Sequence, residues 1–231
     1  MKFFSNKSIL VLVVLSLLAC RTDNKEDNEN SGNKNLTEAV EEISESDKYL
    51  EKIKRAHNAS KFAKEEQVKF KLKLDIGDDV FFDGFVTLKT NGSKARFLDS
   101  NIDRVVDRDN ISTTLDKKLY WLAEIYTIGF WLEADNFKIS NGEIEEYSKS
   151  IYKSPITSNT YTIYSHPLTD VIQYVEYITK IPDQPFNSGT VYFDKYITVN
   201  RVPVSLAWEF KRDNEIIAKA EITRISYPDV F

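Results

Sequence analysis

The chain has 231 residues, a formal net charge of −5 at neutral pH and a single cysteine, Cys20. The acidic balance argues against a nucleic-acid partner, because nucleic acid selects a clustered basic surface. One cysteine excludes a disulfide within the chain. No later apolar stretch approaches the roughly 18 residues that a membrane-crossing helix needs, so one domain of the all-β or α+β kind is expected at this length.

The N-terminal segment has the features of a lipoprotein signal peptide. Lys2 and Lys7 supply a positive start, and residues 9–18 form an apolar stretch too short to span a bilayer. Leu17-Leu18-Ala19-Cys20 resembles the lipobox of bacterial lipoproteins, in which the cysteine receives a diacylglycerol and its freed amine is acylated. The resemblance implies that residues 1–19 are removed and that fatty acyl groups such as palmitate, carried by Cys20, anchor the protein to a membrane.

Residues 20–35 are expected to form a flexible tether after the acylated cysteine. They are rich in Asn, Asp, Glu and Lys and contain almost no apolar residue, so burial cannot offset the entropy lost on ordering them. Within them, Lys25-Glu26-Asp27 resembles the short export signal of some Bacteroidota lipoproteins. Two locations on the bacterial outer membrane therefore stay open, the periplasmic face and the cell surface.

Residues 36–231 are expected to form a single domain that begins with a helix over residues 36–57. Thr37 is one candidate for its N-cap, and Ser44 or Ser46 offers a second start. Apolar residues recur at helical spacing on one side and charged residues fill the other, so one face should lie on an apolar surface. His57 closes the apolar stripe and is expected to cap or pack the helix end rather than to bind a ligand.

Beyond the helix the hydrophobic period changes from 3.6 to 2, which is typical of antiparallel strands with one wet face. The cleanest example is QVKFKLKLDI, and VFFDGFVTLKT and SKARFLDS follow it around an Asn91-Gly92 hairpin turn. RVVDRDNISTTL is predicted as a fourth strand. The same alternation returns in six later segments, with a turn at Asp213-Asn214 before the last, so about nine strands are expected.

One segment, KLYWLAEIYTIGFWLEADNF, does not follow this alternation. As a helix it would be apolar nearly all round and would need burial on more than one side. Three interpretations stay open: a helix in the concave face of a bent sheet, a pair of strands favoured by the β-branched Ile125, Thr127 and Ile128, or a helix resting on a lipid surface.

The order of these pieces resembles the Lol-type (LolA/LolB-like) lipoprotein-carrier superfamily, in a branch found among Bacteroidota lipoproteins. The local echoes are RAHNASKF, FWLEADNFKIS and the closing strand pair over residues 190–227, although Asn136 stands where proline is usual and Asn58 where glycine is usual. The resemblance implies an α+β fold, in which a strongly bent antiparallel β-sheet, or half-barrel, carries an N-terminal helix and an aromatic helix on its concave face.

The resemblance also implies a function, since the carriers hold the acyl chains of a passenger lipoprotein and related proteins hold lipids. We therefore expect a membrane-anchored lipoprotein that binds an apolar ligand, a lipid or acyl chains, in the cell envelope. The side chains expected to line its cavity are Phe70, Leu72, Phe82, Val86, Phe97, Tyr126 and Trp131.

A second reading has the same side chains filling the core solidly, as protein interiors do. The protein would then be a structural or interaction lipoprotein that docks another envelope protein through sheet edges and exposed aromatics. The tyrosines that suit such a wet interface are Tyr147, Tyr152, Tyr161, Tyr164, Tyr174 and Tyr177.

Catalysis is not expected from this sequence. It has two histidines, His57 and His166, and lacks HExxH, GxSxG and glycine-rich phosphate-binding motifs. Carboxylate pairs such as Asp78-Asp79 lie at predicted turns, where they are solvated rather than held at a catalytic distance. No enzyme activity, metal site or cofactor is therefore expected.

Overall fold

The structure of the protein is a computed structural model that describes residues 43–140 and 147–228. The predicted signal peptide, Cys20 and the predicted tether lie outside the described residues. Among the described residues, no helix has the length and apolar character needed to cross a membrane.

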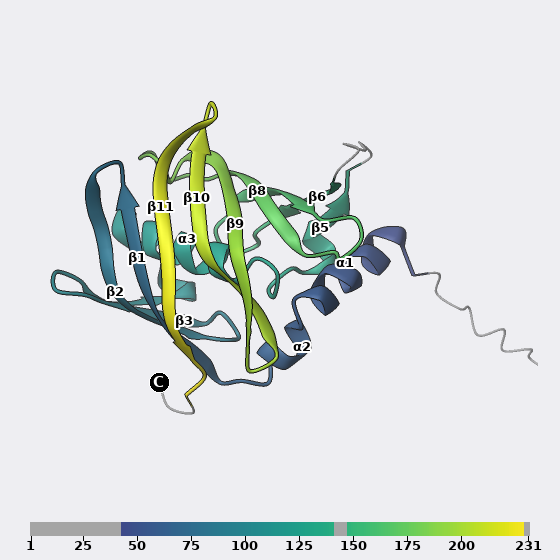
Figure 1. The fold of residues 1–231 in the computed structure, drawn as a ribbon, viewed down its shortest axis with the longest axis horizontal. Coiled ribbons are helices and arrows are strands. Elements are labelled where there is room, and N and C mark those ends of the chain that lie inside the picture. The colour runs from purple at the N-terminus through teal and green to yellow at the C-terminus, as the bar shows by residue number, and fades with distance from the viewer. Residues whose placement is uncertain (1–42, 141–146, 229–231) are drawn as a thin grey trace, which may run out of the picture. The chain divides into compact units, whose positions relative to one another are not determined.

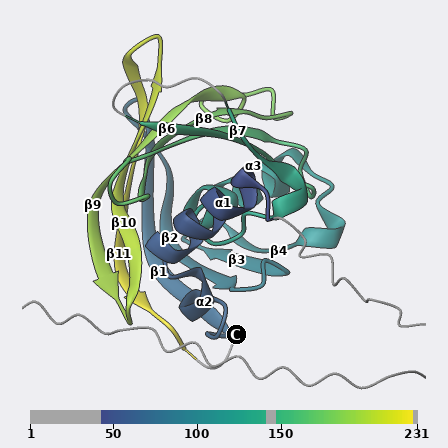
Figure 2. The same ribbon diagram turned by 90° about the vertical axis from the view of Figure 1, so that its right-hand side faces the viewer.

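The described residues form an eleven-stranded sheet in the order β4-β3-β2-β1-β11-β10-β9-β8-β7-β6-β5, and all neighbours pair antiparallel. The strands are β1 (Gln67–Ile76), β2 (Asp79–Lys89), β3 (Lys94–Leu98), β4 (Asp103–Asp107), β5 (Phe137–Ile139), β6 (Ser148–Lys153), β7 (Thr160–Ser165), β8 (Ile172–Ile178), β9 (Ser188–Val199), β10 (Val202–Arg212) and β11 (Glu215–Ser226). The sheet curves around helix α3 (Thr114–Thr127), and α1 (Glu45–Ala56) lies near its opening (Figures 1 and 2). The fold is the expected α+β half-barrel.

The alternation of side chains explains the strands. In β1, Val68, Phe70, Leu72 and Leu74 are at most 1% exposed, whereas Lys69 and Lys73 are exposed. The apolar residues therefore face the core, and the lysines between them face the opposite side of the sheet, towards solvent.

Both predicted hairpin turns are confirmed. Asn91 and Gly92 lie between β2 and β3, and Gly92 has a φ of +74° that a side chain would disfavour. Asp213 and Asn214 both have positive φ values between β10 and β11, which is the geometry of a type I′ turn.

The described first helix begins at the second of the two predicted starts, and Thr37, the other candidate, lies outside the described residues. Ser44 is the N-cap of α1, and its hydroxyl accepts a hydrogen bond from the backbone N–H of Asp47 at 3.1 Å. The helix ends at His57, its C-cap residue. A short helix that was not predicted, α2 (Ala59–Phe62), follows it.

The prediction of a strand over RVVDRDNISTTL is correct only in its first part. β4 ends at Asp107, a 3-10 turn η1 (Arg108–Asn110) follows, and α3 begins at Thr114. Thr113 and Asp116 form a reciprocal capping box. This box satisfies backbone N–H groups at the start of a helix, so the chain turns helical where alternation predicted a strand.

The aromatic segment forms a buried helix in the concave face of the bent sheet, which was the first of its three interpretations. The helix is shorter than predicted. Leu119, Trp121 and Ile125 on α3 are fully buried, so the strand-pair and lipid-surface interpretations are wrong. The helix ends at Thr127, whose hydroxyl donates to the carbonyl of Ala123 at 2.6 Å. The prediction that Trp131 lies on the helix is therefore wrong.

The chain between α3 and β6 holds two short elements that the sequence analysis missed. They are the 3-10 turn η2 (Ala134–Asn136) and the three-residue strand β5. β5 is too short to show an alternation of its own, and it is defined by pairing with β6.

Candidate ligand-binding site

The two edges of the bent sheet approach each other across α3. β4 and β5 stand at opposite ends of the strand order, yet residues next to each edge line one cavity of about 250 Å³. Asn91, Gly92 and Arg108 contribute from the β3–β4 side, and Tyr152 and Ile156 from the β5–β6 side. We call this junction the seam and its cavity the seam cavity.

The floor of the seam cavity is the segment that leaves α3. Ile128, Phe130, Trp131 and Leu132 line it. The indole N–H of Trp131 donates to the carbonyl of Thr90 at 2.7 Å, and the hydroxyl of Tyr152 donates to the carbonyl of Trp131 at 3.3 Å. Trp131 therefore connects the two sides of the seam.

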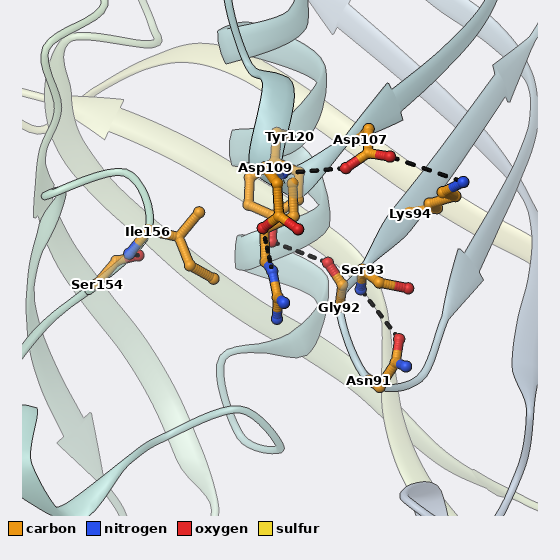
Figure 3. Close-up of polar contacts among 10 residues, drawn as sticks. Asn91, Gly92, Ser93, Lys94, Asp107, Asp109, Tyr120, Ser154 and Ile156 are labelled. Atoms are coloured by element: carbon orange, nitrogen blue, oxygen red, sulfur yellow. Dashed lines mark hydrogen bonds and ion pairs between the residues drawn. The ribbon is translucent and has the colours of Figure 1, made fainter.

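The β3–β4 rim of the seam is fixed by several polar contacts (Figure 3). Tyr120 on α3 donates to the carbonyl of Gly92 at 3.1 Å. The carboxylate of Asp107 accepts a hydrogen bond from the backbone N–H of Asp109 at 3.0 Å and lies 3.6 Å from the ammonium of Lys94. The turn that carries Arg108 is therefore attached to β3 through Asp107, and the turn between β2 and β3 is attached to α3 through Tyr120.

A buried carboxyl group, that of Glu124 on α3, forms part of the opposite wall. Its oxygens accept hydrogen bonds from Ser154 at 2.6 Å, Thr157 at 2.9 and 3.0 Å, Asn159 at 2.8 Å and Tyr161 at 2.7 Å. Burial raises the pKa of Glu124, and the four donors oppose that shift. Glu124 thus ties the loop over residues 154–159 to the central helix.

The hydrogen bonds of this carboxyl group give it a structural role in the site. A buried acid with a raised pKa beside a cavity is a pattern found in active sites. However, donors of the protein itself already satisfy both oxygens of Glu124. Among the described residues there is also no group of three or more His, Cys, Asp and Glu side chains that would hold a metal ion.

The predicted lining residues occupy two different places. Phe70, Leu72, Phe82, Val86 and Phe97 are at most 1% exposed and lie in the hydrophobic core. Within that core Phe70 stacks on Tyr126 with ring centroids 4.3 Å apart, and Phe82 meets Phe97 edge to face at 5.9 Å. Trp131 lies apart from them, in the seam cavity.

His57 lies on the far side of the segment that leaves α3. Its Nε2 accepts a hydrogen bond from the backbone N–H of Ile172 at 3.1 Å, and burial lowers its pKa to about 4. A Cβ atom at Gly129 would lie 2.5 Å from the imidazole Cγ, so only glycine allows this approach. The prediction of a capping and packing histidine is confirmed.

The tyrosines singled out for an interface divide between the two faces of the sheet. Tyr152, Tyr161 and Tyr177 are at most 6% exposed and belong to the interior. Tyr164 and Tyr174 pair across β7 and β8 and stack with ring centroids 4.3 Å apart. Since Tyr161 and Tyr164 are an odd number of positions apart on β7, they face opposite sides.

Sequence reasoning missed the polar residues of the site. Glu124 is the one charged residue within the apolar stretch 119–132, and that isolation was an available signal. Its donors Ser154, Thr157 and Asn159 belong to a loop with no motif or periodicity. Only the fold brings this loop onto α3.

No protein-family model and no curated protein matches the sequence. Among solved structures, the chain is similar to a DUF1329 family protein from Desulfovibrio piger, with a TM-score of 0.48 and 7% identity over 80% of this chain and 94% of that one. It is also similar to a putative outer membrane lipoprotein-sorting protein domain from Vibrio parahaemolyticus, with a TM-score of 0.46 and 9% identity over 79% and 93%. A LolA superfamily protein from Nitrosomonas europaea is also similar, with a TM-score of 0.45 and 7% identity over 81% of this chain and 96% of that one.

Proposed function

We propose that this protein is a membrane-anchored lipoprotein of the bacterial outer membrane whose domain binds an apolar chain in the seam cavity. The observation that carries the proposal is the lining of that cavity. Ile128, Phe130, Trp131, Leu132 and Ile156 give it apolar surface, and the polar groups of its lining include those of Asn91, Arg108, Glu124, Glu133 and Ser154. Concave sites with mostly apolar walls and a few placed polar groups are typical of sites for small ligands.

The size of the cavity sets the size of the ligand. At about 250 Å³ it lies slightly below the range of roughly 300–1,000 Å³ that is usual for whole ligands. It therefore suits part of one acyl chain, from a lipid or from an acylated protein, rather than a complete two-chain lipid.

The anchor is proposed from the sequence alone, on the motif that ends at Cys20. Two or more acyl chains on one cysteine hold a protein on a membrane stably, whereas a single chain binds reversibly. A domain that is held in this way fits a fixed receiver of apolar chains on the periplasmic face or the cell surface better than a shuttle, because a shuttle must leave the membrane.

Photolabelling of the full-length protein in nanodiscs of neutral lipid tests the binding site. The probe is dodecanol carrying a diazirine at the end of its chain. We expect labelled peptides to contain residues 128–133 or 152–156, and excess dodecanol to suppress that labelling. Labelling spread over the surface, or none above background, would contradict the proposal.

Two matched substitutions sharpen this test. Ile156→Trp places an indole in the seam cavity, and Leu168→Trp places the same ring in an exposed hairpin loop where Leu168 is 87% exposed. We expect Ile156→Trp to raise the half-saturating concentration of the probe about tenfold, a loss of about 1.4 kcal/mol of binding free energy, because the larger ring takes up space that the probe's chain would occupy. Leu168→Trp should leave it unchanged.

The anchor has its own test, in cells supplied with radioactive palmitate. The protein should take up the label and remain with the membrane after a high-salt wash. Cys20→Ala should abolish the labelling. A Cys20→Ala protein that is labelled as strongly as the natural one would refute acylation at this cysteine while leaving the seam cavity untouched.

A further inference from the structure

A second cavity of about 360 Å³ adjoins the seam cavity. The residues that line it are Arg108, Asp109, Ile111, Lys117, Ile156, Thr157, Asn159, Lys180 and Ile181. Arg108 and Ile156 line both cavities. The two cavities are therefore neighbours that share these two side chains.

The second cavity is cationic in an acidic protein. Arg108, Lys117 and Lys180 contribute three positive charges, and Asp109 contributes one negative charge. The chain as a whole carries a net charge of −5. The three cations come from η1, from α3 and from the chain after β8, so the fold gathers them from distant parts of the sequence.

Arg108 retains donors that could bind a ligand. Its Nε donates to the carboxylate of Asp109 at 3.2 Å, and Asp109 is 76% exposed. Exposed ion pairs of this kind contribute little. Among the described residues no hydrogen bond engages its two terminal amino groups, which are the donors that grip a carboxylate or phosphate in bidentate fashion.

The loop over residues 154–159 separates the two cavities and supplies polar groups to the second. Glu124 holds this loop through Thr157 and Asn159, and both residues line the second cavity. In Figure 3 the side chain of Ile156 points from the loop towards Asp109 and Tyr120. The apolar wall of one cavity thus continues directly into the cationic wall of the next.

We infer that the second cavity binds an anionic head group, so that the ligand is a single-chain anionic amphiphile with a carboxylate or phosphate end. This inference rests on the proposed function, because it needs the chain to occupy the seam cavity. The chain of the ligand lies against Trp131 and Phe130. Its head group accepts hydrogen bonds from Arg108 and forms ion pairs with Lys117 and Lys180.

Matched probes with different head groups test the inference. The full-length protein in neutral nanodiscs is photolabelled with diazirine derivatives of dodecanol, dodecanoic acid and dodecyl phosphate, each at a measured mole fraction in the bilayer. We expect at least one anionic probe to half-saturate the seam at a mole fraction about tenfold below that of the alcohol, the factor that one charge-assisted hydrogen bond supplies. Whether the acid or the phosphate gains more identifies the head group.

Substitution of the two lysines tests the assigned cavity. Lys117→Gln with Lys180→Gln should bring the ratio of anionic to alcohol labelling towards one. Lys52→Gln with Lys219→Gln removes the same charge from exposed positions on α1 and β11, and should leave the ratio at its natural value. Raising the salt concentration should lower the ratio in the natural protein.

The outcomes separate this inference from the proposed function. If all three probes label the seam equally, the anionic head-group site is wrong and the apolar chain site stands. If no probe labels the seam, the proposed function fails and the inference fails with it. If the control pair lowers the ratio as much as Lys117→Gln with Lys180→Gln, the preference comes from overall charge and the assigned cavity is wrong.

Discussion

His57 is a buried histidine that is held in its neutral form. Its ring lies among aromatic rings, with Phe130 at 6.0 Å and Tyr196 at 6.2 Å between centroids, and its Nε2 accepts the N–H of Ile172. Protonation would charge the ring in an apolar site and remove that acceptor. The buried imidazole therefore makes the stability of the domain depend on pH.

The sign of this dependence follows from the lowered pKa. Burial moves it from 6.5 to about 4, so the stabilisation is complete above pH 6.5 and is lost as the pH falls towards 4. Relative to His57→Gln, whose amide oxygen can accept the same N–H, the natural protein should lose about 3 kcal/mol of unfolding free energy over that range. Urea denaturation at several pH values measures the unfolding free energies of the natural protein and of His57→Gln. If the two free energies change with pH in parallel, the prediction is contradicted.

Glu124 should show a dependence on pH whose sign is opposite. Burial raises its pKa above the ordinary value of 4.5, so its contribution to stability is complete below pH 4.5 and declines as the pH rises towards the folded-state pKa. Against Glu124→Gln, which carries no titratable group, the natural protein should therefore become relatively less stable as the pH rises above 4.5. A difference in unfolding free energy that stays constant with pH would contradict this.

At the scale of residues, the sequence predicted roles where a side chain is tied to a local pattern. His57 closes an apolar helical stripe, and Gly92 follows asparagine between two strands, so both roles could be read from neighbours in the chain. Arg108 and Ile156 are 48 positions apart in the numbering and share two cavities only because the sheet bends. No local pattern contains that information.

Helix α3 depends on the capping box that sets its first turn. The hydroxyl of Thr113 accepts the N–H of Asp116 at 3.0 Å, and the Asp116 carboxylate also binds Arg104 at 2.7 and 2.9 Å. The Arg104 guanidinium holds the pKa of Asp116 below its ordinary value. The box therefore fixes both the start of the helix and its attachment to β4.

Loss of the capping hydroxyl should be measurable. Thr113→Ala should lower the free energy of unfolding by about 1 kcal/mol, as the loss of an N-cap side chain commonly does. Thr113→Ser keeps the hydroxyl and should stay close to the natural value. Equal losses in both variants would show that the methyl group matters and the cap does not.

At the scale of elements, alternation identified the long strands and missed features set by a few residues. β1, β7, β10 and β11 follow from period-two patterns with polar turns between them. The capping box at Thr113 and Asp116 was hidden within a stretch read as a strand. β5 has only three residues, and its pairing with β6 is what makes it a strand.

The sheet as a whole has protected central strands and a less protected edge. β1 and β11 each pair on both sides, whereas β4 pairs with β3 alone. We expect hydrogen–deuterium exchange to be slowest in β1 and β11 and faster in β4, since edge strands leave alternate N–H groups without a partner strand. Exchange in β4 as slow as in β1 would mean that something else covers this edge.

The half-barrel could be predicted from the order of the pieces, whereas the position of the cavity could not. Residues expected to line it, such as Phe70 and Phe97, face inward as their alternation required, but the rings pack together there. The seam cavity instead lies where the two edges of the sheet approach each other, against Trp131. Its location depends on how far the sheet curves, which is a property of all the strands together.

The pairing of the first strand with the last has a consequence for how the chain could be rearranged. Every other pair of neighbours in the sheet is consecutive in sequence, and only β1 with β11 joins distant parts, with Lys69 opposite Ser226. A circular permutant cut between α3 and β5, with its old ends joined, would therefore be a plain meander from β5 to β4. Its contact order would be lower and its folding correspondingly faster, and its new termini would lie beside the seam.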